Sequence, residues 1–163
     1  MEVIIRKALD KDYDYFIEST IKLSQFNRNQ HGEKCKYDDY DLVLESIKEK
    51  ADLSFNTRNE KLSIFIAEIN GSPVGYALGR IYEEEKTADN GTGKIGLIDE
   101  LYVDENIRQC GVGNKLINEV ILWIKSRGIN RVKLHAYSWN KNATHMYEKL
   151  GFDEYAVSLE KYI

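Results

Sequence analysis

The fold is decided by one stretch of the sequence, KIGLIDELYVDENIRQCGVGNKLINEVILWIKSRG, which covers residues 94–128. Its first part, 94–103, is rich in β-branched and aromatic side chains, which is typical of a strand. Residues 111–128 repeat apolar side chains three and four positions apart, which predicts an amphipathic helix ending at Gly128. A strand, a glycine turn and a helix in this order predict an α/β fold.

The chain outside this stretch carries the same kinds of pattern. Further strands are predicted over 2–8, 61–69, 74–82, 132–136 and 155–163, and further helices over 9–20, 40–51 and 142–150. The polar segments 27–36 and 83–93 are predicted loops. Since strands and helices alternate without a repeat or a long linker, we predict one α/β domain over 1–163.

Composition limits the classes of function. The chain has 163 residues, with 23 Lys and Arg against 27 Asp and Glu, so its net charge is −4 and general nucleic-acid binding is not expected. Two cysteines cannot form a disulfide framework or a zinc site, which favours a reducing compartment. No apolar run is long enough to span a membrane, and no signal-peptide pattern is present. We therefore expect a cytoplasmic protein without a nucleic-acid or membrane partner.

The turn Arg108-Gln109-Cys110-Gly111-Val112-Gly113 is a candidate anion site. The first turn of a helix presents unpaired backbone N–H groups and a partial positive charge, and glycines let a phosphate come close. Arg108 adds a cation that suits a pyrophosphate. A dinucleotide fingerprint needs glycine where Leu116 stands, and a P-loop needs Gly-Lys-Ser/Thr instead of Gly113-Asn114-Lys115. A tight entry into the helix, with no ligand, stays open as the alternative.

Two motifs together resemble the GCN5-related N-acetyltransferase (GNAT) family. The motifs are Arg108-x-x-Gly111-x-Gly113 before an apolar helix, and Asn140, Ala143 and Tyr147 followed by Gly151-Phe152. The order of predicted elements is also that of the family, so the resemblance covers essentially the whole chain. It implies a mixed, mostly antiparallel sheet of six to seven strands with about four helices. Two parallel strands in it, 97–103 and 132–136, would splay apart.

The resemblance further implies a site for acetyl-coenzyme A (acetyl-CoA) and no metal. The pantetheine arm would enter the splay and meet the backbone of Leu101, Tyr102 and Val103. The pyrophosphate would meet the backbone amides of Cys110, Gly111, Val112, Gly113 and Asn114, with Arg108 or Gln109 alongside. Asn140, Ala143 and Tyr147 would line the far side of the thiol arm.

Acetyl transfer to an amine needs a base, a donor for the carbonyl oxygen and an acid for the departing thiolate. The resemblance makes Tyr147 the acid, and an ordinary tyrosine pKa near 10 suits a proton donor at neutral pH. A tyrosine packed in the core is the alternative reading. Glu100 and Asp99 are the base candidates, and we favour Glu100. Neighbours on a strand point to opposite faces, so one alone faces the cleft unless a bulge turns both.

The remaining reactive residues point to no other chemistry. Cys110 precedes a helix, where a thiol pKa falls, but no histidine is paired with it, so we expect direct transfer. The backbone N–H of Leu101 is the expected donor to the carbonyl oxygen. His31, His135 and His145 lack metal-ligand spacing.

Carboxylates and aromatic rings indicate a cationic acceptor. They lie at 37–41, at 83–85, and at Tyr137 and Trp139. Ala136-x-x-Trp139-Asn140 is similar to diamine and spermidine acetyltransferases, so we expect a small primary amine such as a polyamine. The alternatives are a protein N-terminus or lysine as acceptor, and a non-catalytic module that binds acetyl-CoA. Glu83 to Glu85 can also be only a solvated loop. We expect a homodimer, from the family and from the frequency of twofold oligomers.

Overall fold

The computed structural model describes residues 2–32, 39–88 and 90–163. Within them lie the strands β1 (Ile4–Lys7), β2 (Leu62–Ile69), β3 (Ser72–Glu83), β4 (Lys94–Val103) and β5 (Val132–Leu134). The α-helices are α1 (Tyr13–His31), α2 (Tyr40–Asn56), α3 (Val112–Ser126) and α4 (Lys141–Lys149). Short 3₁₀ helices cover Asp10–Asp12 and Glu105–Ile107. The predicted α/β organisation is confirmed, and most element boundaries fall within two residues of the predicted ones.

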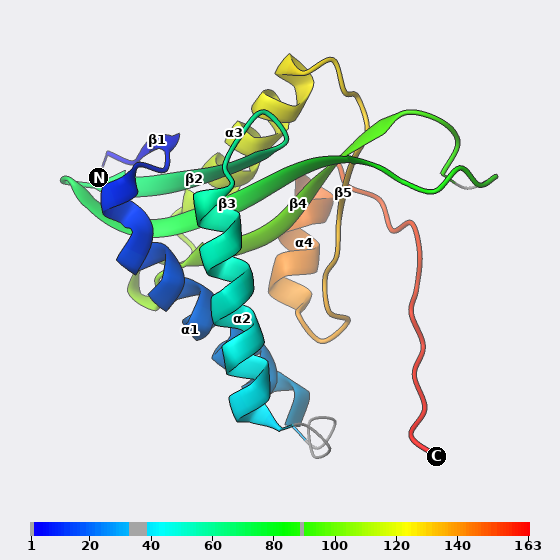
Figure 1. The fold of residues 1–163 in the computed structure, drawn as a ribbon, viewed down its shortest axis with the longest axis horizontal. Helices are drawn as coiled ribbons and strands as arrows, with labels where there is room; N and C mark the ends of the chain where they lie inside the picture. The colour runs from blue at the N-terminus through cyan, green and yellow to red at the C-terminus, as the bar shows by residue number, and fades with distance from the viewer. Residues whose placement is uncertain (1, 33–38, 89) are drawn as a thin grey trace.

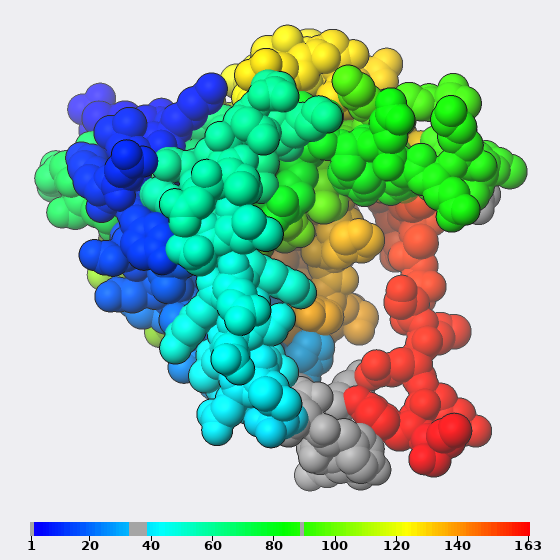
Figure 2. Space-filling view, viewed as in Figure 1, coloured from blue at the N-terminus to red at the C-terminus, as the bar shows by residue number. Residues whose placement is uncertain are grey.

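The sheet has fewer strands than predicted. In the described residues it has five, in the order β1-β2-β3-β4-β5, with β1 to β4 antiparallel and β5 parallel to β4. The prediction of six to seven strands was wrong because 155–163 forms no strand. That segment alternates apolar side chains, but a strand also needs a paired neighbour. Within the described residues Tyr155 meets β5 through its ring, 4.6 Å from Lys133 Nζ, and no strand pairing follows. Figure 2 shows the segment, in red, standing off the rest of the surface, and Leu159 is 93% exposed.

Helices cover both faces of the sheet. Figure 1 shows α1 and α2 on one face and α3 on the other. The α1/α2 face buries Phe16, Phe55 and Tyr76 in one apolar cluster. The opposite face buries the apolar stripe of α3, and α4 packs against the same cluster through Tyr147 and Leu150. The sheet therefore separates two cores, and β4 contributes side chains to both.

The parallel strands β4 and β5 are paired over a short length only. Gly96 lies opposite Val132, and the register ends with Ile98 opposite Leu134. Residues 99–103 of β4 continue without β5 beside them, so the predicted splay begins directly after Ile98. One edge of β4 is consequently open where the two strands diverge (Figure 1).

Helix α1 is longer than the sequence predicted. Residues 27–31, predicted as loop, continue the helix to His31, and Gly32 with φ of 57° ends it. The polar composition of this turn predicted a loop, because its tertiary contacts cannot be inferred from the local sequence. The ring of His31 lies edge-on to Tyr137 at 4.4 Å, and Phe26 lies 5.9 Å from Trp139. The rest of the predicted loop, 33–38, lies outside the described residues.

Candidate active site

A β-bulge in β4 places both candidate bases on the same side of the sheet. Glu100 lies opposite Leu78, and Ile98 lies opposite Gly79, so Asp99 is the extra residue with no partner in β3. An extra residue interrupts the alternation of side chains along a strand. Both carboxylates therefore face α2 and line one pocket of about 450 Å³. The pocket is completed by Lys50, Leu53, Ser54, Thr57 and Arg80.

Asp99 is engaged in a structural ion pair. Its Oδ2 accepts a hydrogen bond from Arg80 Nε at 2.6 Å. The same guanidinium donates through Nη2 to the Ser54 hydroxyl of α2 at 2.9 Å. Asp99 is thus neutralised by a cation that is itself held by a neighbouring helix.

Glu100 has a different environment. Its Oε2 accepts a hydrogen bond of 2.6 Å from the Tyr76 hydroxyl, and no described cation forms an ion pair with it. Burial raises the pKa of the Glu100 carboxyl, and the hydrogen bond from Tyr76 opposes that rise. A carboxylate that is desolvated and free of a cation is the better proton acceptor of the two. The geometry favours Glu100 over Asp99.

The open edge of β4 carries backbone groups next to this pocket. Asp104 N–H donates to Val74 C=O of the β3 side at 3.0 Å. Backbone groups of successive strand residues point to opposite edges, so those of Val103 and Leu101 point to the open edge. The Val103 C=O already accepts a hydrogen bond from Arg108 Nε at 3.0 Å. The backbone groups of Tyr102 are not brought to this edge, because Tyr102 lies opposite Tyr76 and points them toward β3.

The glycine turn before α3 has the backbone form of an anion site. Gln109 and Gly111 have φ of 64° and 79°, and a Cβ on Gly111 would meet nothing within 4 Å. The first helical hydrogen bond runs from Lys115 N–H to Gly111 C=O, so the amides of Val112, Gly113 and Asn114 precede the helical pattern. Cys110 is exposed, whereas the Val112 side chain is buried and anchors the turn.

Arg108 contacts two other elements beside the turn. Besides its bond to Val103, its guanidinium lies 5.1 Å from the ring centroid of Phe26 on α1. It therefore connects the turn to β4 and α1.

Helix α4 lies against the same turn. A Cβ on Gly113 would lie 3.4 Å from Met146 Sδ and 3.7 Å from Leu101 Cδ2, so α3, α4 and β4 meet there. Asn140 caps α4 by accepting from Ala143 N–H at 3.2 Å, which explains the spacing of these two motif residues. Burial raises the pKa of Tyr147, and its ring contacts Phe152. A hydroxyl that keeps its proton suits the predicted acid.

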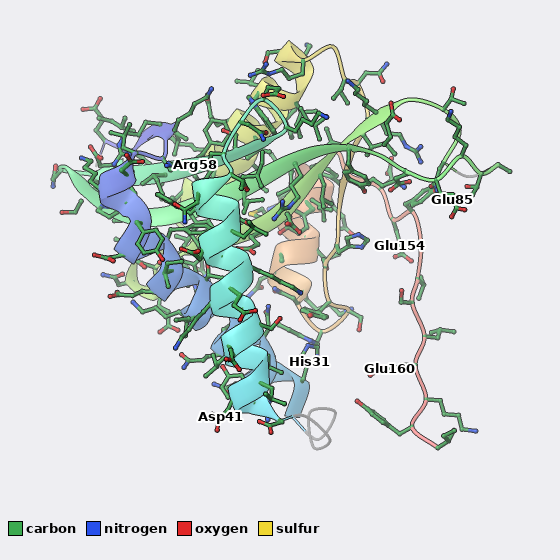
Figure 3. The ribbon with its side chains drawn as sticks, viewed as in Figure 1. His31, Asp41, Arg58, Glu85, Glu154 and Glu160 are labelled. Carbon is green, nitrogen blue, oxygen red and sulfur yellow. The ribbon has the colours of Figure 1, made fainter. Side chains whose placement is uncertain are left out.

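The predicted acceptor residues fall into separate groups. Tyr137 and Trp139 are stacked, with ring centroids 5.4 Å apart, and His31 closes one side. Glu84 is instead paired with Lys133 at 2.7 Å, and Figure 3 shows Glu85 far from His31. Asp39 caps α2 through its side chain. Tyr37 and Asp38 lie outside the described residues.

The family follows from comparison with known proteins. Residues 21–152 match the model of the Acetyltransferase (GNAT) family. The chain belongs to the GNAT family. It is 34% identical over 103 residues to an uncharacterized N-acetyltransferase of Methanocaldococcus jannaschii, a match that covers 61% of the chain and 43% of the relative. The chain spans less than half the length of the curated relatives that it matches.

Two solved structures share the GNAT fold of this chain. A predicted acetyltransferase of Clostridium acetobutylicum with acetyl-CoA has a TM-score of 0.71 at 21% identity, covering 99% of this chain and 96% of the other. AAC(6')-Iy, in complex with a bisubstrate analogue that joins CoA to acetylneamine, has a TM-score of 0.71 at 17% identity. That match covers 100% of this chain and 99% of the other. Both likenesses establish the fold.

None of the helices in the described residues is both long and apolar enough to cross a membrane. These residues also hold no group of three or more His, Cys, Asp or Glu side chains able to bind a metal ion.

Several residues in and behind the pocket were not predicted from the sequence. Arg80 and Ser54 line the pocket, and Tyr76 lies in the core behind Glu100. Their positions on β3 and α2 follow an ordinary core pattern in the sequence. A buried tyrosine in β3 was the available signal, because a buried hydroxyl requires a hydrogen-bond partner.

Proposed function

We propose that this GNAT protein is an acetyl-CoA-dependent N-acetyltransferase that acts on a primary amine. The observation that carries the proposal is the position of Glu100. Its carboxylate is partly buried and forms no ion pair with any cation of the described residues, and it lies in a pocket beside the open edge of β4. The backbone amides of the glycine turn lie at the C-terminal end of the same strand. An amine entering the pocket would thus meet a base close to the place where a thioester can bind.

Acetyl-CoA supplies an activated acetyl group, and the turn fits its pyrophosphate. The amides of Val112, Gly113 and Asn114 are free of helical partners, and Gly111 leaves the approach open. We assign the neighbouring amides of Cys110 and Gly111 to the same contact. The backbone of Leu101, with the N–H of Val103, is available to the pantetheine arm. The far wall is α4, with Asn140, Ala143 and Tyr147.

Each step of the chemistry has a residue in this proposal. Glu100 accepts the proton of the ammonium group, directly or through a water, so that a neutral amine can attack. The Leu101 N–H donates to the carbonyl oxygen as charge develops there. Tyr147 gives its hydroxyl proton to the departing thiolate. Asp99 holds Arg80 and takes no part in proton transfer.

For the acceptor we propose a small organic cation such as a polyamine. Support comes from Glu100 and from the stacked rings of Tyr137 and Trp139, which suit a cation. Asp99 and Glu84 do not support a cationic acceptor, because their carboxylates are already paired with Arg80 and Lys133. The homodimer and the cytoplasmic location stay predictions from the sequence.

The test is release of free thiol from acetyl-CoA across an acceptor panel. The panel contains spermidine, short diamines, an aminoglycoside, and peptides with a free N-terminus or one lysine. Turnover with the small amines, abolished in Glu100→Gln, is the expected result. Turnover with the peptides alone would contradict the small-amine acceptor and show that the acceptor is a protein N-terminus or lysine. Tight acetyl-CoA binding without turnover on any acceptor would favour a non-catalytic module.

A further inference from the structure

The Tyr76 hydroxyl is buried in the core directly behind Glu100. Tyr76 is fully buried on β3, with its ring edge-on to Phe16 at 4.8 Å and stacked on Tyr102 at 6.1 Å. Phenylalanine would keep these ring contacts. The hydroxyl is therefore the feature that needs an explanation, because burying it without a partner is costly.

Register explains how the hydroxyl reaches Glu100. Tyr76 lies opposite Tyr102, and Glu100 is two residues away on the same face of β4. Such a diagonal neighbour is within reach of a long side chain. The resulting bond to Oε2 is 2.6 Å, a short distance typical of a hydroxyl that donates to an ionised carboxylate.

A second hydroxyl extends this contact into α1. Thr20 Oγ1 lies 3.1 Å from the Tyr76 hydroxyl and 2.9 Å from the Phe16 C=O. Each hydroxyl carries one proton. Tyr76 gives its proton to Glu100, and the Phe16 C=O accepts the proton of Thr20, so a hydrogen bond between the two hydroxyls shares the Thr20 proton between Phe16 and Tyr76. A phenol that accepts a hydrogen bond becomes a stronger donor.

We propose that Tyr76 is a positioning residue that fixes one carboxylate oxygen of Glu100 toward the acceptor pocket, with Thr20 behind it. The inference rests on the proposed role of Glu100 as the base. It explains how one of two adjacent carboxylates stays oriented without a cation, while the other is held by Arg80.

The other charged groups around Glu100 do not orient its carboxylate. They are Asp99 on its own strand, Arg80 on β3 and Lys50 on α2, with Tyr15 on α1 acting on Tyr76. Arg80 is bonded to Asp99 and Ser54. Within the described residues, Tyr76 is the group that hydrogen-bonds to the Glu100 carboxylate.

The decisive experiment is a ¹³C NMR titration of the ligand-free protein labelled at glutamate carboxyl carbons. The Glu100 signal is assigned as the one that Glu100→Gln removes. Tyr76→Phe takes away a hydrogen bond that stabilises the charged form, so the pKa of Glu100 is expected to rise by about one unit. Thr20→Val should raise it less, because the Tyr76 bond remains. An unchanged Glu100 pKa in both variants would overturn the proposal.

Tyr82→Phe is the matched control. Tyr82 is also on β3, its hydroxyl donates to Glu84 at 2.9 Å, and it neither lines the pocket nor contacts Glu100. It should leave the Glu100 titration unchanged. An equal shift in Tyr82→Phe would mean that the effect is general, and the proposal would fail.

A kinetic readout separates this inference from the proposed function. With acetyl-CoA and an accepted amine of the panel, Tyr76→Phe should lower kcat and move the acidic limb of the pH profile upward with the Glu100 pKa. The KM for acetyl-CoA should stay unchanged. If Glu100→Gln keeps full activity, the proposed base is wrong, whatever the titration shows. If Glu100→Gln is inactive and Tyr76→Phe matches the wild type at every pH, the positioning role alone is wrong.

Discussion

The two ends of the candidate site are built from different parts of the chain. The turn before α3 uses backbone amides from consecutive residues, and its shape depends on the positive φ of Gly111. The pocket uses side chains from several elements, with Glu100 on β4, Arg80 on β3 and Lys50 on α2. The turn can therefore be recognised in a short motif, whereas the pocket depends on one extra residue in β4. Substitutions should affect cofactor binding at the turn and proton transfer at the pocket.

The largest expected effect is at the pocket. Glu100→Gln removes the proposed base and keeps the size of the side chain, so kcat should fall by roughly 10²–10⁴-fold, the usual contribution of a general base. The KM for acetyl-CoA should not change. Asp99→Asn is the neighbouring control, and because Asp99 is paired with Arg80 it should lower kcat by less. A larger loss in Asp99→Asn than in Glu100→Gln would reverse the assignment of the base.

A smaller loss is expected at Tyr147, which lies on α4 between the two ends. Tyr147→Phe should lower kcat by about 10²-fold, at the lower limit for an acid catalyst, since a thiolate also leaves without one. The free energy of unfolding of this variant should be unchanged, because the Tyr147 hydroxyl has no hydrogen-bond partner among the described residues. Steady-state kinetics and urea unfolding of one preparation measure kcat and the free energy of unfolding. Wild-type kcat in a variant that binds acetyl-CoA normally would mean that Tyr147 is only a core residue.

At the turn, the expected effect is on affinity. Gly111→Ala forces a side chain into left-handed backbone, which costs about 1–2 kcal/mol. If the turn relaxes to a different φ, its amides move and the KM for acetyl-CoA should rise by about tenfold. Gly128→Ala is the matched control, because Gly128 has φ of 76°, equally free space, and a position at the other end of α3. Equal KM values in the two variants would contradict the anion-site assignment.

Local patterns predicted most of the fold but not the decisive details of the site. The helix after Gly111, the strands over 61–69 and 74–82, and β4 follow from short-range patterns and residue composition. The helical turn 27–31 could not be predicted, because Phe26 and His31 contact residues more than a hundred positions away. The bulge at Asp99 depends on the register with β3, so the sequence left the choice between the two carboxylates open.

The smallest effect concerns stability. It tests whether ionisation of the buried Glu100 carboxyl lowers the free energy of unfolding. Burial raises the pKa of Glu100 above its ordinary value of 4.5, so over the interval between the two values the folded protein holds a proton that the unfolded chain has released. Stability is therefore lost as the pH rises through that interval. Glu100→Gln has no charge to bury and keeps an oxygen that can accept from Tyr76. It should match the wild type at pH ~4 and exceed it at pH ~8 by about 1.4 kcal/mol for each unit of the pKa difference, as measured by urea unfolding. Asp99→Asn should gain no such stability at high pH, because the substitution breaks the ion pair with Arg80.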